Sequence, residues 1–251
     1  MNVNIIVVKW GNKFTPEHVN RLYRMAKRNI TLPFTFYCHT EDPTDIYDEI
    51  EIIPLDETLD LEKWWWKLTL FKKNSLDGIN LYLDLDVVIQ NNIDHLFSKV
   101  VKDRLTLIFH DEDWDDQIFN NLNPTTAPEY NSSIMLWYNN ENQNIYDKFI
   151  ENIKVYQNVY EGIDRFLTHE MDNSCFNKLD DNEWYFRISF KRQEDIINCE
   201  SRTIKYPIFD DKGKRIGSKS VRAFYNPSKS FCVFNGCHED HFYSGMENFL
   251  L

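Results

Sequence analysis

Two aspartates, Asp84 and Asp86, follow the apolar run 81–83 and precede the apolar run 87–89. In an extended chain residues i and i+2 point to the same side, so we expect the two carboxylates to converge on one point. Converging carboxylates repel each other unless a cation lies between them, and hard oxygen ligands suit Mg²⁺ or Mn²⁺. The pattern predicts a divalent-metal site at the end of a strand. A pair of solvated turn aspartates is the alternative, because this spacing often occurs by chance.

The segments around this pair alternate between strand and helix patterns. Thr15-Pro16-Glu17 has the cap residue, the proline and the acid that are typical of a helix start. Strands are expected at residues 5–8, 34–38, 51–53, 81–83, 106–109, 133–137 and 231–234, and further helices at 62–73 and about 145–156. This alternation indicates an α/β fold with a mostly parallel sheet and helices on both faces. The acidic pair falls at the carboxyl end of a strand, where ligands bind in such sheets.

Composition excludes several classes of protein. The chain has 251 residues, 28 Lys plus Arg and 40 Asp plus Glu, which give a formal net charge of −12. This acidity argues against a nucleic-acid binder and against a polybasic membrane anchor. No apolar run approaches a transmembrane helix, and the five cysteines are irregularly spaced, so we expect a cytoplasmic protein without a disulfide framework. Neither GxGxxG nor GxxxxGK[ST] occurs, which argues against the Rossmann dehydrogenase and P-loop classes.

Six segments follow one another along the chain: 8–11 (VKWG), 64–71 (WWWKLTLF), 82–89 (YLDLDVVI), 130–137 (YNSSIMLW), 162–167 (GIDRFL) and 234–236 (FNG). As an ordered set spanning about residues 4–242, they resemble a bacterial and viral family of GT-A-type glycosyltransferases related to the family 8 retaining enzymes. The resemblance implies a single domain over 1–251, with a nucleotide-binding half over about 1–110 and an acceptor-side half over about 111–251. It also implies sugar transfer from a nucleotide diphosphate donor, usually UDP-linked, with Mn²⁺ or Mg²⁺.

The resemblance also implies which residues form the donor site. Asp84 and Asp86 match the motif that binds the metal and the ribose and diphosphate of the donor. Lys9, Trp10 and Gly11 match the loop near the nucleotide base. Whether the Trp10 ring stacks on a ligand or packs against the protein stays open.

Further matches concern the sugar. Asn131, Ser132 and Ser133 match the segment that faces the donor sugar and the acceptor, although they could simply form a turn into the following strand. Asp164 matches the acid of a Gly-Asp-Gln-like motif near the reacting sugar, with Arg165 where the family often has Gln. The resemblance implies that Asp164 orients the sugar or stabilises developing positive charge, and Asn131 is expected as the second catalytic residue.

The C-terminal segment departs from the family pattern. Relatives carry His-Gly there, with the histidine as a metal ligand, whereas this chain has Asn235-Gly236. Asn235 or His238 is expected to complete the metal site, with His241 as a further candidate. Zinc bound by Cys232, Cys237 and the two histidines is an alternative, but the spacing matches no well-known zinc motif.

Basic and aromatic side chains complete the expected site. Lys9 and Lys67 are the cations expected near the diphosphate, with exposure to solvent as the alternative. Residues 62–73 are expected to form a helix with Trp64 and Trp65 on its apolar face. Because neighbours on a helix diverge by about 100°, two of the tryptophans at 64–66 should pack inside and one should remain for stacking on a sugar or base. The acidic run 111–116 is expected to be a solvated loop, with acceptor recognition or a second cation as alternatives.

Together these observations predict a metal-dependent glycosyltransferase, a hexosyl- or related transferase. It would use a UDP-sugar donor, an unidentified hydroxyl acceptor and retention of configuration. A sugar-nucleotide-forming transferase is disfavoured because it needs a basic, Gly-rich N-terminal loop. The alternative from another class is a non-catalytic nucleotide-sugar or glycan-binding protein derived from such an enzyme.

Overall fold

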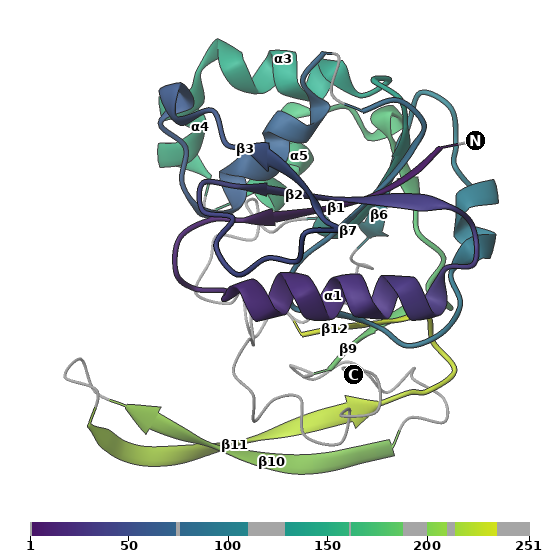
Figure 1. Ribbon diagram of the computed structural model, residues 1–251. Helices are drawn as coiled ribbons and strands as arrows, with labels where there is room; N and C mark the ends of the chain where they lie inside the picture. The colour runs from purple at the N-terminus through teal and green to yellow at the C-terminus, as the bar shows by residue number, and fades with distance from the viewer. Residues whose placement is uncertain are drawn as a thin grey trace.

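A seven-stranded mixed sheet forms the centre of the protein (Figure 1). The computed structural model describes residues 2–73, 76–109, 129–160, 162–187, 200–209 and 214–234. The strand order is β3-β2-β1-β4-β7-β6-β8, in which β7 runs antiparallel to both neighbours and the other strands are parallel. The strands are β1 (Val3–Lys9), β2 (Phe34–Thr40), β3 (Glu51–Pro54), β4 (Ile79–Leu83), β6 (Leu105–Phe109), β7 (Tyr130–Tyr138) and β8 (Phe176–Lys178). The predicted mostly parallel sheet is confirmed.

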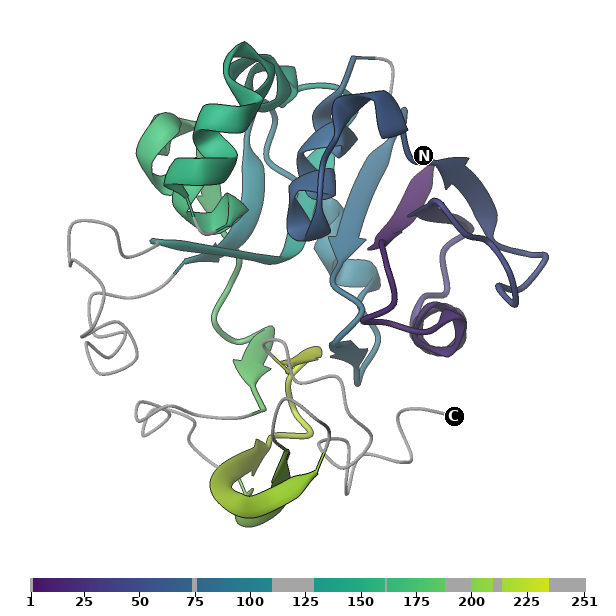
Figure 2. The ribbon, with the colours of Figure 1, turned by 90° about the vertical axis from the view of Figure 1, so that its left-hand side faces the viewer.

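Helices cover both faces of this sheet. Helix α1 (Pro16–Asn29) lies on one face, and α3 (Gln143–Glu151), α4 (Ile153–Val159) and α5 (Ile163–Glu170) lie on the other (Figures 1 and 2). The predicted start of α1 is confirmed, with Thr15 as its N-cap and Pro16 in its first turn. The single helix expected over 145–156 is wrong, because the backbone breaks at Asn152, where φ is −152°. None of the described helices has the length and apolarity needed to cross a bilayer.

The segment with three tryptophans is a 3-10 helix, η2 (Lys63–Phe71), not the α-helix expected over 62–73. A 3-10 helix has three residues per turn, so residues i and i+3 share one side. Trp65 and Trp66 are buried, whereas Trp64 is 42% exposed. The prediction that two of the three tryptophans pack inside is confirmed, but the expectation that Trp64 shares the apolar face is wrong. Trp64 lies at the start of η2, in its first turn, whereas Lys67 and Leu70 on the same side of this helix are buried.

A smaller sheet, in the order β5-β12-β9, lies beyond β4. It consists of β5 (Val87–Ile89), β9 (Trp184–Phe186) and β12 (Phe231–Val233), and β12 confirms the strand expected near 231–234. Strands β10 (Glu200–Phe209) and β11 (Arg215–Tyr225) form a hairpin apart from the central sheet (Figure 2). Cys38, Cys175 and Cys232, the cysteines in the described ranges, form no disulfide. The remaining short helices in those ranges are η1 (Glu57–Leu59), η3 (Asp94–Ser98) and η5 (Asn173–Cys175).

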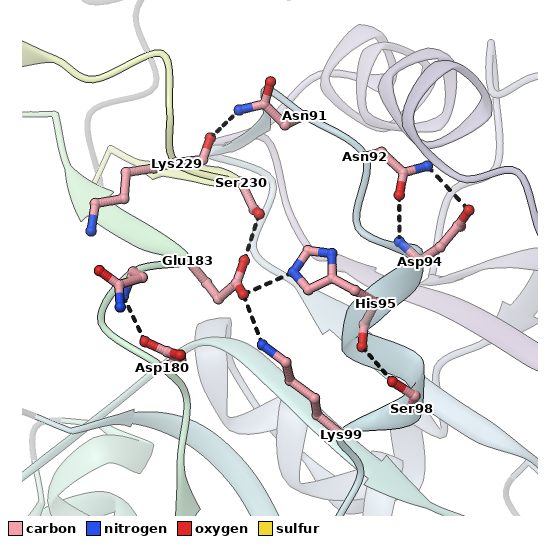
Figure 3. A network of polar contacts seen from close by, with 11 residues as sticks. Asn91, Asn92, Asp94, His95, Ser98, Lys99, Asp180, Glu183, Lys229 and Ser230 are labelled. Carbon is pink, nitrogen blue, oxygen red and sulfur yellow. Dashed lines mark hydrogen bonds and ion pairs between the residues drawn. The ribbon is translucent and has the colours of Figure 1, made fainter.

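Glu183, just before β9, ties the small sheet to η3 (Figure 3). Its carboxylate accepts hydrogen bonds from Ser230 Oγ at 2.6 Å and Lys99 Nζ at 3.1 Å, and His95 Nε2 lies 2.8 Å from it. Burial acts to raise the pKa of Glu183, but the hydrogen bonds from Ser230, His95 and Lys99 outweigh it and lower this pKa. The ionised carboxylate therefore stabilises the fold.

We expect Glu183→Gln to lower the free energy of unfolding at pH 7 by about 1–3 kcal/mol, because a charged acceptor is lost from a buried network. The folded pKa of Glu183 is lowered, so this contribution is present above its unfolded pKa and disappears as pH falls through the folded value. Urea unfolding at pH 7 and pH 3 checks both effects. The matched control is Glu151→Gln, an exposed partner of Lys148, which should cost under about 1 kcal/mol. Equal losses in the two variants would contradict the assignment.

Candidate functional site

The acidic pair lies where β4 leaves the sheet. The Asp84 N–H donates to Ser133 O at 2.8 Å, which continues the β4–β7 pairing by one residue. The Val87 N–H then donates to Asp84 O at 3.0 Å and closes a turn through Leu85 and Asp86. The expectation of an extended chain across the pair is therefore wrong, since the hydrogen bond bends the backbone there. Both aspartates still act on one group, because the charge of each raises the pKa of the Tyr82 phenol.

Lys67 is held against Asp84. Its Nζ lies 2.7 Å from Asp84 Oδ1 and 2.9 Å from Oδ2, and it also donates to Ser132 Oγ at 3.3 Å. Lys67 is buried, so the alternative of exposure to solvent is wrong for this residue. The contact joins η2 to the end of β4 across seventeen residues of sequence.

The buried Tyr82 side chain also contacts the Asp84 carboxylate. Its hydroxyl donates to Asp84 Oδ1 at 2.5 Å. Burial, followed by the charges of Asp84, Asp86 and Asp164, raises the pKa of Tyr82 well above its ordinary value. The raised pKa favours the protonated phenol, which is the donor in this hydrogen bond. Sequence reasoning missed Tyr82, although its place two residues before Asp84 on a buried strand gave a usable signal.

A β-bulge in β7 shapes the segment 131–133. Leu107 pairs with Met135 but the next residue, Ile108, pairs with Asn131, so residues 132–134 have no partner on β6. All three predicted residues, Asn131, Ser132 and Ser133, are buried inside β7, which begins at Tyr130 and not at 133. The Asn131 side chain is used locally, since its Oδ1 accepts the Ser133 N–H at 3.0 Å. The bulge leaves the Ser132 N–H available for a partner outside the sheet. Such β-bulges are common beside functional sites.

That partner is Asp164, in the first turn of α5. The Ser132 N–H donates to Asp164 Oδ1 at 3.0 Å, and the Thr168 hydroxyl donates to Asp164 O at 2.9 Å. Burial raises the pKa of Asp164, and the charge of Asp84 acts in the same direction, whereas Lys67 and the Ser132 N–H oppose the shift. The structure thus brings Lys67, Asp84, Ser132 and Asp164 into one cluster.

The loop after β1 lies at the same edge of the sheet. Strands β1 and β4 are parallel neighbours, so the carboxyl end of β1 at Lys9 meets that of β4 near Asp84. Lys9 is buried, which again contradicts the alternative of exposure, and Trp10 is partly buried against the core that includes η2. Gly11 has a φ of +63°, a conformation that favours glycine, and its N–H donates to Glu41 Oε1 at 2.6 Å.

The carboxylate oxygens at the carboxyl edge of the central sheet are ligands of the kind that a hard cation prefers. Asp84, Asp86 and Asp164 supply carboxylate oxygens, and the Lys67 ammonium contacts Asp84. Within the described ranges no three His, Cys, Asp or Glu side chains are grouped closely enough to hold a metal ion. The expected further ligands Asn235, His238 and His241 lie outside the described residues, as do Cys237 and the acidic run 111–116.

A mixed sheet with one reversed strand, helices on both faces and an acidic pair at the carboxyl edge of β4 defines a GT-A-like α/β fold. Among solved structures, the chain resembles the galactosyltransferase LgtC. The complex of LgtC with donor and acceptor sugar analogues has a TM-score of 0.60 and 11% identity, with 98% of this chain and 93% of that chain covered. An active-site mutant of LgtC gives a TM-score of 0.61 with the same identity and coverage.

A second solved structure is more distant. The glycosyltransferase GlyE of Streptococcus pneumoniae TIGR4 has a TM-score of 0.50 and 14% identity, over 73% of this chain and 47% of that chain. No protein-family model and no curated protein matches the sequence. At these identities the likeness shows the fold, and the predicted GT-A-like fold is confirmed.

Proposed function

We propose that this protein is a glycosyltransferase that moves a sugar from a nucleotide diphosphate donor, with UDP as the expected nucleotide, to a hydroxyl acceptor. The observation that carries the proposal is the cluster of Lys67, Asp84, Ser132 and Asp164 at the carboxyl edge of a GT-A-like sheet. Structures with this fold include enzymes named as sugar transferases, one of them with donor and acceptor sugar analogues. Lys9, Trp10 and Gly11 would face the nucleotide at the neighbouring strand end.

In this proposal Asp84 and Asp86 hold Mn²⁺ or Mg²⁺, and Asn235 or His238 completes the site. When bound, the cation would neutralise charge on the diphosphate leaving group. Lys67 offsets the negative charge around Asp84 and contacts Ser132. The Ser132 N–H keeps the Asp164 carboxylate oriented beside the reacting sugar, with Asn131 shaping the same bulge. Retention of configuration and the division into nucleotide-binding and acceptor-side halves belong to the same proposal.

Thermal unfolding with a panel of nucleoside diphosphates, each with and without Mn²⁺, tests this proposal. A ligand present at 100 times its dissociation constant adds about 2.7 kcal/mol to the free energy of unfolding. We expect UDP with Mn²⁺ to raise the melting temperature, and Asp86→Asn to abolish the rise. The control is Asp60→Asn, because Asp60 is exposed and its left-handed backbone (φ 48°) tolerates Asn. If no nucleotide stabilises the protein with any metal, the proposal fails.

One observation favours a second candidate, a non-catalytic nucleotide-sugar or glycan-binding protein. Both oxygens of Asp84 already contact Lys67, and one of them also accepts from Tyr82. A site in which lysine substitutes for the metal would bind a nucleotide equally well without Mn²⁺. Stabilisation by UDP that is independent of Mn²⁺, together with no release of UDP from UDP-sugars, would favour this candidate over the transferase.

A further inference from the structure

Trp64 is a large aromatic side chain that the protein leaves open to solvent beside the site. It is 42% exposed, whereas its neighbours Trp65 and Trp66 are 5% and 3% exposed. An indole is large, apolar and flat, so an exposed indole beside a candidate site offers a surface on which the apolar face of a ligand can pack.

Helix geometry and one neighbour, Gly162, place Trp64 near the cluster. On the 3-10 helix η2 it precedes Lys67 by three residues, so both side chains leave the same side of the helix, about 6 Å apart along its axis. Its ring also lies against Gly162, where a Cβ atom would be 3.3 Å from Trp64 Nε1. Gly162 is the N-cap of α5 and stands two residues before Asp164. Trp64 therefore adjoins both Lys67 and the start of α5.

The backbone on both sides of the indole takes conformations that ordinary residues avoid. Lys63 has a φ of +53°, in the left-handed region, and Gly162 has a φ of +154°. Lys63 Nζ also lies 5.6 Å from the centroid of the Trp64 ring, within the range of a cation–π contact. The indole thus has Lys63 and Gly162 as neighbours and is still 42% exposed.

We propose that Trp64 is a stacking platform for a pyranose ring of the acceptor saccharide. The face of an indole is electron-rich, and the C–H groups on one face of a pyranose carry partial positive charge, so the two surfaces are complementary. Lys67, which suits a diphosphate, is 8% exposed, whereas Trp64 is 42% exposed. A saccharide resting on Trp64 would lie next to Gly162 and could present a hydroxyl toward the sugar beside Asp164. This inference rests on the proposed function.

The test follows the indole N–H signals of the seven tryptophans by NMR during titration with methyl glycosides of glucose, galactose, mannose and N-acetylglucosamine, in the presence of UDP and Mn²⁺. The signal of Trp64 is assigned by its absence from the spectrum of Trp64→Phe. We expect at least one glycoside to shift the Trp64 signal, and Trp64→Ala to weaken that glycoside roughly tenfold, as estimated for the loss of one aromatic contact. Stabilisation by UDP and Mn²⁺ should not change in Trp64→Ala.

The matched control is Tyr138→Ala, because Tyr138 is 38% exposed but ends β7 at the opposite edge of the sheet. It should leave glycoside affinity unchanged. If UDP binds but no glycoside moves the Trp64 signal, the inference is overturned while the proposed function stands. If glycosides move it but no nucleotide binds, the platform is supported and the transferase proposal fails. A Trp64 signal that shifts with protein concentration, and not with sugar, would overturn the inference in favour of self-association.

Discussion

Replacing Lys67 by methionine is expected to lower the free energy of unfolding by about 2–4 kcal/mol when no divalent cation is present. Removing one partner of a buried ion pair costs about 3–5 kcal/mol because the other charge is left uncompensated. Asp84 retains 23% side-chain exposure, so solvent reduces this cost. The charge of Asp84 also acts on the Asp164 carboxyl, and the charges of Asp84, Asp86 and Asp164 all act on the Tyr82 phenol, so loss of the ammonium leaves this region more negative. Methionine keeps the length of the side chain, so the loss reports on charge and not on packing.

The same variant tests the metal site. Without the Lys67 ammonium the carboxylates attract a cation more strongly, so we expect Mn²⁺ to restore part of the lost stability in Lys67→Met and to have a smaller effect on the wild type. Urea unfolding with and without Mn²⁺ measures both. The control is Lys154→Met, which removes an exposed ion pair with Asp60 and should cost under about 1 kcal/mol regardless of metal. A Lys67→Met variant as stable as the wild type would show that the ion pair is unimportant.

Asp164→Asn is expected to reduce turnover by about 10²–10³-fold while leaving the protein folded. A preorganised charge beside a reacting centre contributes on this scale, and asparagine can still accept the Ser132 N–H without supplying the charge. The release of UDP from UDP-sugars at saturating donor is the measurement. The control is Asp147→Asn on the exposed side of α3, which should retain full activity. If Asp164→Asn kept full turnover at saturating donor, the role assigned to Asp164 would be wrong.

In Asp164→Asn the free energy of unfolding should not fall along with the turnover. The folded pKa of Asp164 is raised, so its ionised form destabilises the fold above that pKa, and the penalty vanishes as pH falls below its unfolded value. We therefore expect Asp164→Asn to be at least as stable as the wild type at pH 7, with no such advantage at pH 3. A loss of activity without a loss of stability separates a role in chemistry from a role in folding.

Local sequence patterns predicted most of the central sheet and the start of α1. Short, mostly apolar runs of three to five residues identified β1, β2, β4 and β6, and β1, β4 and β6 are buried almost throughout, as in a sheet covered on both faces. The cap, proline and acid at 15–17 identified α1 because these residue types satisfy the first turn of a helix directly. Helix type was less predictable. Only the structure showed that η2 is a 3-10 helix that buries Trp66 and exposes Trp64, because this depends on how the segment packs against other elements.

By itself the sequence determined the chemical types at the site: two aspartates after a buried strand, a further acid at Asp164, and Lys67 within a tryptophan-rich segment. Only the tertiary structure decided how they meet. The contacts of Lys67 with Asp84 and of Ser132 with Asp164 join residues far apart in sequence, and no local periodicity encodes them. The bulge in β7 depends on two strands pairing out of register, and the turn through Leu85 and Asp86 depends on one backbone hydrogen bond. Such features follow from packing between elements, which local patterns do not specify.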